Sequence, residues 1–455
     1  MKICAYVQEA YAKQTYKNEC MDTRQFVGLR VVIDALEKCG YTVEYAGIAT
    51  VHEYDIVLVS ITAFCDWWSF LSERIRWKKG SYKVFVGGAG VLHVTPFLPW
   101  VDAFMIGRGE DTIGPLVKAA EKGDRFEDDS IVYSDDFSEE KIYHIKQATG
   151  SYPNPIQLHK GTPWVEGQIG CNHRCLFCSY TWSRKQNFSG AFKWDGGGTI
   201  DMSQRECALL DYKSGEYKVN WKMIRTTAID GSSQRLRYGV GKKIHDDVIV
   251  DFVRDAVASG TSPRIVRLFN IVGYPTETIE DYATVVEVFK RADEACTETS
   301  NGKKWIFGLQ NNHFIPYPAT PMACAPFSCK DYRNSMISGL KSTLPKRRLY
   351  SGRCVDLVEG QLEEGLSTVL LNVIVARAGR EDWESIEKIA LSKKFWSSKD
   401  AIKCATLEKY FDLDVLCGAY TPDSLPSRYL RTYAKVEKVW GETPLEREYR
   451  VQCGL

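Results

Sequence analysis

Three cysteines within eight residues, Cys171, Cys175 and Cys178, are the side chains of this sequence best suited to carry chemistry. Their spacing is Cys-x3-Cys-x2-Cys, and thiolates on so short a loop can converge on one metal centre. Three thiolates hold three irons of a cubane iron–sulfur cluster and leave the fourth iron without a protein ligand. A small molecule can bind and react at such an open position. The spacing therefore predicts a [4Fe–4S] cluster with one accessible iron.

Two other interpretations of this loop stay open. A zinc site could use His173 as a fourth ligand, but structural zinc sites usually pair two ligand clusters far apart in sequence. The chain has no second Cys-x2-Cys pair and no His-x3-His pair. Chance is the other interpretation, since the chain has fifteen cysteines. A glycine before the first cysteine and an aromatic residue, Phe177, before the last one favour the cluster over both.

The loop resembles the cluster motif of the radical S-adenosylmethionine (SAM) superfamily, which also has an aromatic residue before its last cysteine. In that family the open iron chelates the amino and carboxylate groups of SAM. One electron from the cluster then cleaves SAM to methionine and a 5′-deoxyadenosyl radical. The resemblance implies that Cys171, Cys175 and Cys178 bind the cluster. It also implies a flavodoxin-type or ferredoxin-type electron donor as a partner.

Further matches to this family follow in the expected order along the chain. Residues 230–233, followed by Arg235 and Arg237, resemble the segment that touches the SAM carboxylate or ribose, and arginine offers a carboxylate its donors in a fixed fork. Residues 273–277 resemble the Gly-x-Pro-x-Glu strand end that approaches the adenine, and residues 311–321 resemble the final barrel segment. The resemblance implies SAM contacts for Phe177, Ser232, Ser233, Arg237 and Gly273. Without it, the two serines would be ordinary helix-capping residues.

The middle of this region departs from the family pattern. A strand ending in Gly-Gly-Glu usually follows the cluster loop and binds the SAM amino group. Here residues 196–198 are three glycines without a following glutamate. Glu206 and Asp211 are the candidates to replace it, and the sequence does not choose between them.

The first ~145 residues alternate short apolar strands with helical patterns, which predicts a doubly wound, Rossmann-like α/β domain over residues 1–145. This half resembles the cobalamin-binding-type domain that precedes many radical SAM cores. Its Val-Gly-Gly strand end and its Asp-x4-Gly-x-Gly-Glu segment carry the resemblance. Members with a histidine cobalt ligand carry Asp-x-His-x2-Gly after the first strand. The segment from Gln8 to Gly40 has no histidine, so we expect the fold without cobalamin. The expected strand segments are residues 2–7, 55–61, 83–88 and 101–110, with a helix over 23–39 and another from near Thr112.

Residues 155–330 show repeated strand–helix units that resemble the partial (β/α)6 radical SAM barrel. In barrels of parallel strands, reactive groups collect at the carboxyl ends of the strands. Residues 331–455 are expected to form a mostly helical C-terminal domain, with an irregular tail from Thr421. The expected elements of both parts are strands 264–272 and 305–309 and helices 246–258, 278–289, 362–375, 383–390 and 401–411.

Composition excludes some partners. A net charge of +1 argues against a broad electrostatic grip on nucleic acid or membrane. No apolar run approaches the ~20 residues that span a bilayer, and scattered cysteines fit a reducing cytoplasm. The basic segment 346–348, with Arg353, is a solvated face or a local phosphate contact. Two further sets of side chains have both a structural and a functional interpretation: Cys324, Cys329 and Cys354 as an auxiliary cluster, and His313 as a proton donor.

These features predict an enzyme that cleaves SAM and abstracts hydrogen from an unactivated C–H bond. Isomerisation is the leading expectation, because rearrangement of a substrate radical needs no second cofactor. The atypical middle of the core also resembles phage radical SAM isomerases that remodel amino-acid-bearing thymine in viral DNA, so such a modified thymine, in DNA or as a nucleotide, is the leading substrate. The alternatives are cobalamin-dependent methyl transfer to a small molecule or peptide, and an iron–sulfur redox sensor without enzymatic activity.

Overall fold

The computed structural model describes residues 1–8, 27–148, 156–157, 163–164, 168–171, 173–185, 187–188, 209–214, 221, 226–260, 264–328, 333–348, 362–392 and 404–454. Several residues singled out from the sequence lie outside this part: Gly196, Gly197, Gly198, Glu206, Cys329, Arg353 and Cys354.

The N-terminal half contains a six-stranded sheet with the strand order β2-β1-β3-β4-β5-β6. Strands β1 to β5 are parallel, and β6 is antiparallel to β5. The order 2-1-3-4-5 is one of the common orders of doubly wound α/β folds, so the α/β class expected for this half is confirmed. The strands are β1 (Ile3–Tyr6), β2 (Val43–Ala46), β3 (Ile56–Ser60), β4 (Lys83–Gly87), β5 (Ala103–Met105) and β6 (Ile131–Tyr133).

Helices cover both faces of this sheet. Successive residues of a strand point to opposite faces, so the side chains on both faces are buried under these helices. One face packs on α2 (Val27–Lys38) and α4 (Ile113–Glu121). The other face packs on α3 (Cys65–Arg74), which contributes the buried Trp67 and Trp68. A sheet covered on both faces needs apolar residues at consecutive positions. The remaining elements of this half are the 3₁₀ turns η3 (Val51–Glu53), η4 (Thr95–Trp100) and η5 (Ser134–Asp136) and the strand β7 (Tyr143–His144).

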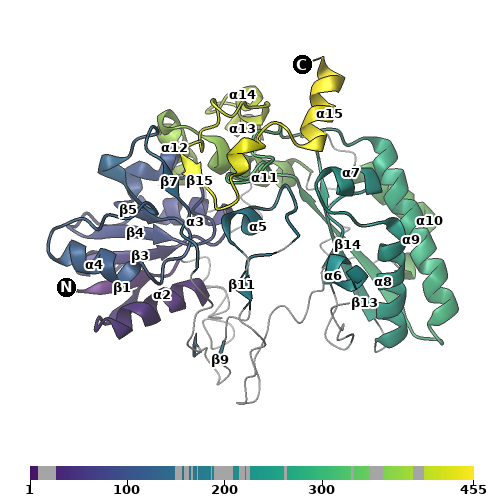
Figure 1. Ribbon diagram of the computed structural model, residues 1–455, viewed down its shortest axis with the longest axis horizontal. Helices are drawn as coiled ribbons and strands as arrows, with labels where there is room; N and C mark the ends of the chain where they lie inside the picture. The colour runs from purple at the N-terminus through teal and green to yellow at the C-terminus, as the bar shows by residue number, and fades with distance from the viewer. Residues whose placement is uncertain are drawn as a thin grey trace.

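The second half contains three parallel strands, β12 (Thr226–Ala228), β13 (Arg264–Val272) and β14 (Trp305–His313). Helices α8 (Asp246–Ser259), α9 (Ile279–Thr299) and α10 (Arg333–Thr343) share an apolar core with one face of these strands. Figure 1 shows this sheet beside the first one, with the short helix α5 (Ser179–Ser183) between them. The complete six-stranded barrel remains a prediction.

Smaller elements complete this half. One short antiparallel pair precedes the cysteine loop, and the two strands of a second pair lie on either side of the loop in sequence. Three short helical segments also belong to this half. They are β8 (Ile156–Gln157) with β9 (Pro163–Trp164), β10 (Gln168–Ile169) with β11 (Asn187–Phe188), α6 (Leu209–Ser214), α7 (Gln234–Gly239) and η7 (Lys346–Arg348).

The C-terminal segment packs against both sheets. Residues of α11 (Leu362–Arg377) and α12 (Trp383–Ser392) share one apolar core with α3 of the first half. Trp68 Nε1 donates to the carbonyl of Leu371 at 3.1 Å. Strand β15 (Leu430–Arg431) pairs with β7. The boundary expected at residue 331 remains a prediction, but among the described residues this segment joins the core of the first sheet. Its elements are α11 (Leu362–Arg377), η9 (Arg380–Asp382), α12 (Trp383–Ser392), α13 (Cys404–Leu407), α14 (Leu413–Cys417), β15 (Leu430–Arg431), η11 (Val436–Lys438) and α15 (Pro444–Cys453).

The expectation of an irregular tail from Thr421 was wrong at its end. Helix α15 covers Pro444–Cys453 and packs on α7, where the Leu445 side chain lies against Gly239. Thr443 and Glu446 form a capping box, and a proline occupies the first turn. Both are helix-start signals visible in the sequence, so this helix could have been predicted.

Arg377 ties the C-terminal helices to the second half. Its side chain is buried and donates to the carbonyls of Ala323, Ala325, Leu416 and Gly418. Four carbonyl acceptors share the desolvated charge, and burial lowers the pKa of this guanidinium to about 10. In the described part of the chain, no helix combines the length and apolar character that crossing a bilayer requires.

Candidate metal centre

The cysteine loop is a tight turn between β10 and α5. Gly170 and Arg174 both have left-handed backbone, with φ of 70° and 46°. The backbone N–H of Cys178 donates to the carbonyl of Cys175 at 3.1 Å. These turns fold the loop back on itself, so Cys171, Cys175 and Cys178 lie on one short stretch of chain. All three are free thiols, and Cys175 is the most buried.

Side chains of α5 hold the backbone of the loop. Thr181 Oγ1 donates to the carbonyl of Cys171 at 2.7 Å, and Trp182 Nε1 donates to that of Cys175 at 2.9 Å. Both donors are buried. The loop is therefore fixed through its carbonyl groups, and its sulfur atoms stay available as ligands.

The loop lies at the carboxyl ends of the three parallel strands. The backbone of Leu176 donates to the carbonyl of Val240, beside the end of α7, at 2.9 Å. The ring of Phe177 lies 6.2 Å from that of Tyr274, which follows β13, and Tyr274 lies 5.3 Å from Phe314, which follows β14. The sequence predicted that reactive groups would collect at this edge, and the cysteines lie there.

Burial dominates the electrostatics of the thiols. It raises the pKa of the Cys175 thiol to about 12; the positive charge of Lys242 opposes this shift, and Asp230 and the neighbouring cysteines add to it. Burial also raises the pKa of Cys178. Metal ligation needs thiolates, so iron binding should release protons from this loop.

Within the described residues, no group of three His, Cys, Asp or Glu side chains is arranged to hold a metal ion. A single tetrahedral zinc ion would need its sulfur ligands about 2.3 Å from one centre. In a cubane, each thiolate binds a different iron, so the sulfurs stand further apart. Three thiols on one loop are a suitable donor set for a cluster with an open iron, and the choice between zinc and a cluster stays a prediction.

The two serines expected to contact SAM are buried and bonded inside the protein. Ser233 caps α7 and donates to the carboxylate of Asp281. Ser232 donates to Glu277 Oε1 at 3.0 Å and accepts from Asn270 at 3.1 Å. Both hydroxyl groups are therefore already hydrogen-bonded within the protein. Direct contact with SAM remains a prediction for both.

Arg237 is also engaged inside the protein. Its side chain has no exposed surface, and it donates to the carbonyls of Ile244 and Gly231 at 3.0 and 3.1 Å and to the carboxylate of Asp246. The guanidinium thus connects the segment after β12 to the start of α8. Its predicted contact with a SAM carboxylate gains no geometric support from these bonds.

Gly273 lies where the main chain makes a close approach. Its φ is +83°, and a Cβ here would lie 3.1 Å from the Ser328 carbonyl and 3.3 Å from His313 Nδ1. Its backbone N–H donates to the carboxylate of Glu277. A side chain would strain this turn, so glycine at the end of β13 has a clear structural reason.

Sequence reasoning missed a buried polar network at this edge. The Asn270 side chain accepts from the N–H of Gly231 at 2.9 Å and donates to Asn311 at 3.1 Å. Lys242 Nζ donates to the carbonyl of Ala228 at 2.6 Å and forms an ion pair with Asp230. Burial raises the pKa of Glu277 to about 7, although backbone and Ser232 donors oppose the shift. The signal was present, since Asn270 interrupts an apolar strand near its carboxyl end.

The basic segment η7 does not lie at this edge. Arg348 lies 3.4 Å over the ring of Trp305 and 3.1 Å from the carboxylate of Asp293. Trp305 begins β14, whereas His313 ends it, and eight steps of about 3.3 Å separate the two ends by about 26 Å. A phosphate held at η7 would therefore be remote from the cysteine loop. Cys324, one of three cysteines considered for an auxiliary cluster, is buried in an apolar cluster.

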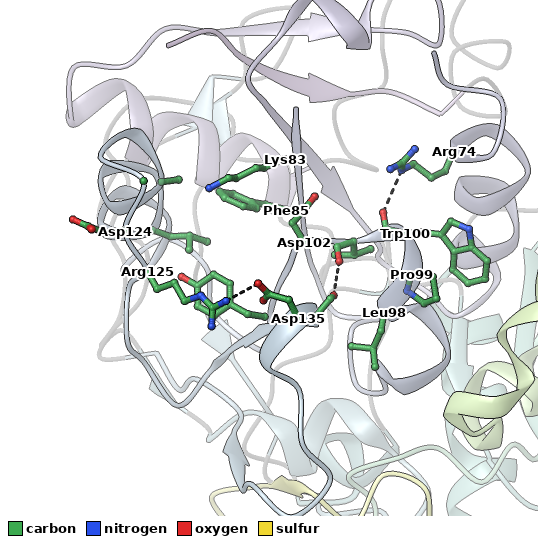
Figure 2. A pocket seen from close by; sticks show the side chains of 16 residues that line it. Arg74, Lys83, Phe85, Leu98, Pro99, Trp100, Asp102, Asp124, Arg125 and Asp135 are labelled. Carbon is green, nitrogen blue, oxygen red and sulfur yellow. Dashed lines mark hydrogen bonds and ion pairs between the residues drawn. The ribbon is translucent and has the colours of Figure 1, made fainter. Parts of the chain in front are cut away.

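A cavity of 480 Å³ lies in the first sheet at the amino ends of β4 and β5 (Figure 2). Four of its charged side chains already have partners in the protein. Arg125 pairs with Asp135 at 2.5 Å, Asp102 accepts from the backbone N–H of Val84 at 2.7 Å, and Arg74 donates to the Trp100 carbonyl at 3.2 Å. Ligands of open α/β sheets bind at the carboxyl ends of strands, so this cavity is not a candidate active site.

Comparisons with known proteins do not add an assignment. No protein-family model matches this chain. The curated proteins also gave no significant match.

Proposed function

We propose that this protein is a radical SAM enzyme with a [4Fe–4S] cluster bound by Cys171, Cys175 and Cys178. One observation carries the proposal: the Cys-x3-Cys-x2-Cys loop lies at the carboxyl edge of a parallel sheet, against residues that follow β12, β13 and β14. Three thiols supply three ligands of a four-iron cluster, and active sites of parallel α/β folds lie at this edge.

When bound, the cluster supplies one electron that cleaves SAM to methionine and a 5′-deoxyadenosyl radical. The chain supplies binding, orientation and exclusion of water. Thr181 and Trp182 hold the backbone of the loop through the carbonyls of Cys171 and Cys175. The rings of Phe177, Tyr274 and Phe314 lie in one apolar cluster beside the loop, and such a wall would help to exclude water from the reaction.

Lys242 contributes a positive charge close to Cys175. This charge favours the thiolate form that a metal requires. The ion pair with Asp230 and the bond to the Ala228 carbonyl hold the ammonium group at the end of β12. In this proposal the Lys242–Asp230 pair acts through its charge near Cys175 and is not itself a metal ligand.

Hydrogen abstraction followed by isomerisation is the reaction we propose, because rearrangement of a substrate radical requires no cobalamin. An amino-acid-modified thymine in DNA or as a nucleotide is the specific substrate proposed on the sequence resemblance. The remote basic segment 346–348 gives no support to phosphate binding near the loop. A flavodoxin-type or ferredoxin-type protein would deliver the electron.

The test is SAM cleavage by the protein after anaerobic reconstitution with iron and sulfide. With dithionite as reductant and without added cobalamin, the protein should bind about four irons per chain and form 5′-deoxyadenosine. Chromatography with mass detection measures this product. Protein that retains zinc and takes up no iron, or that binds iron but forms no 5′-deoxyadenosine, would overturn the proposal.

A further inference from the structure

A buried lysine, Lys242, lies beside the most buried cysteine of the loop. The two residues before it contact the loop backbone on both sides of that cysteine. The carbonyl of Val240 accepts from the N–H of Leu176 at 2.9 Å. A Cβ added at Gly241 would lie 3.4 Å from the carbonyl oxygen of Arg174. The Lys242 side chain itself is only 7% exposed, so its charge is enclosed next to the loop.

Two partners fix the ammonium group at the end of β12. Lys242 Nζ donates to the carbonyl of Ala228 at 2.6 Å and to the carboxylate of Asp230. The carbonyl of Asp230 accepts from the hydroxyl of Tyr274 at 3.1 Å, and its φ of 52° is left-handed, a conformation that aspartate tolerates. The Asp230 side chain is 16% exposed. Both charges therefore have defined positions at the edge where the cysteine loop lies.

The two charges do not cancel at the loop. Burial has the largest effect on the pKa of the Cys175 thiol and raises it, and of the two charges Lys242 lowers this pKa by more than Asp230 raises it. Water screens exposed charges, whereas buried charges are screened much less. Arg174, on the loop, is exposed. The positive charge of Lys242 thus acts on Cys175 more strongly than the negative charge beside it.

Such a charge matters most to a metal centre that changes its own charge. Reduction of a [4Fe–4S]²⁺ cluster to [4Fe–4S]⁺ adds one electron and no proton, so the centre becomes more negative. A nearby cation favours the reduced state by Coulomb attraction, and a nearby anion disfavours it. Charge, hydrogen bonds to the sulfurs and solvent exposure are the features that set the potentials of iron–sulfur clusters.

We propose that the Lys242–Asp230 pair controls the reduction potential of the cluster, with Lys242 raising the potential and Asp230 lowering it. This inference rests on the proposed function, because it concerns the cluster that the loop would hold. It goes further by assigning two positioning residues that determine how readily the cluster takes its electron from a flavodoxin-type or ferredoxin-type donor. Neither side chain is a ligand.

The potential is measured on full-length, anaerobically reconstituted protein without SAM. Dithionite supplies the electrons of the redox titration, and electron paramagnetic resonance follows the reduced cluster. Lys242→Gln removes the charge and keeps an amide donor for the Ala228 carbonyl. This change should lower the equilibrium constant for one-electron reduction about tenfold, which is a downward shift of about 59 mV. Asp230→Asn keeps the shape of the side chain, and should raise that constant at least threefold.

Two further variants separate charge from structural damage. The double variant Lys242→Gln with Asp230→Asn should have a potential between those of the single variants, because damage would add and opposite charges compensate. Lys303→Gln is the matched control. Lys303 also donates to a backbone carbonyl, that of Ala258, but it lies before the amino end of β14. Its loss should leave the potential at the wild-type value.

Shifts of both single variants in the same direction would overturn the proposal. An unchanged potential in both, or an equal shift in Lys303→Gln, would do the same. If Lys242→Gln takes up no iron, Asp230→Asn decides alone, and a potential at or below that of the wild type would contradict the inference.

This inference and the proposed function fail in distinguishable ways. A wild-type protein that forms no cluster would overturn both. A cluster that cleaves SAM but keeps one potential in all variants would overturn only the role of the pair. The expected shifts without formation of 5′-deoxyadenosine would support the pair and overturn the radical SAM function.

Discussion

The Cys175→Ala variant should lose cluster binding and SAM cleavage together, with 5′-deoxyadenosine formation below about 1% of the wild-type rate after anaerobic reconstitution. Cys175 is the most buried of the three loop cysteines, and its backbone carbonyl is fixed by Trp182. With two thiolates left, the loop cannot supply the three ligands of the cluster. Iron analysis and product chromatography on the same sample measure both losses.

The same substitution at Cys453 is the matched control. Cys453 is exposed at the end of α15, so Cys453→Ala should bind iron and form 5′-deoxyadenosine at the wild-type level. A Cys175→Ala protein that keeps wild-type iron content and cleavage would remove this cysteine from the centre. Parallel loss in both variants would mean that the substitutions damage the fold and not the centre.

The Glu277→Gln variant should become more stable relative to the wild type as the pH rises from 5 to 7. The folded-state pKa of Glu277 is raised to about 7 from 4.5, chiefly by burial. Between these values the folded protein binds the proton that the unfolded chain has lost, so wild-type stability falls as pH rises. For one carboxyl the loss between pH 5 and pH 7 is about 2 kcal/mol. Glutamine has no proton to lose and should avoid it.

Urea-induced unfolding at several pH values measures this difference. Glu384→Gln is the matched control, because the Glu384 side chain on α12 is 62% exposed and has no burial to undo. Its free energy of unfolding should stay within about 0.5 kcal/mol of the wild type at each pH. A difference between Glu277→Gln and wild type that does not change between pH 5 and pH 7 would contradict the assignment of a proton to the folded Glu277.

Local sequence patterns predicted the elements that position the site. The apolar run from Asp55 to Ile61 indicated β3, because a strand covered on both faces needs apolar residues at successive positions. Thr278 and Asp281 indicated the start of α9, and they form the capping box there. Strand β14 extends beyond the expected 305–309 to His313, since polar residues such as Asn311 join the parallel ladder with β13.

Long-range partners could not be read from the sequence. Ser233 and Arg237 have side chains suited to SAM, but Asp281 lies 48 residues from Ser233, and no spacing rule reveals that the two meet. The packing of Trp68 on Leu371 spans 303 residues and joins the C-terminal helices to the first sheet. Burial and pairing of this kind depend on the tertiary fold, whereas helix periods and caps depend on near neighbours.

Electron paramagnetic resonance of the reduced, reconstituted protein tests whether Cys171, Cys175 and Cys178 hold a cluster whose fourth iron is open to SAM. The reduced protein should give the signal of one [4Fe–4S]⁺ cluster, and addition of SAM should change its g values, because the proposed function requires SAM to bind the open iron. A cluster signal that SAM leaves unchanged, or the absence of a cluster signal after reconstitution, would contradict the account.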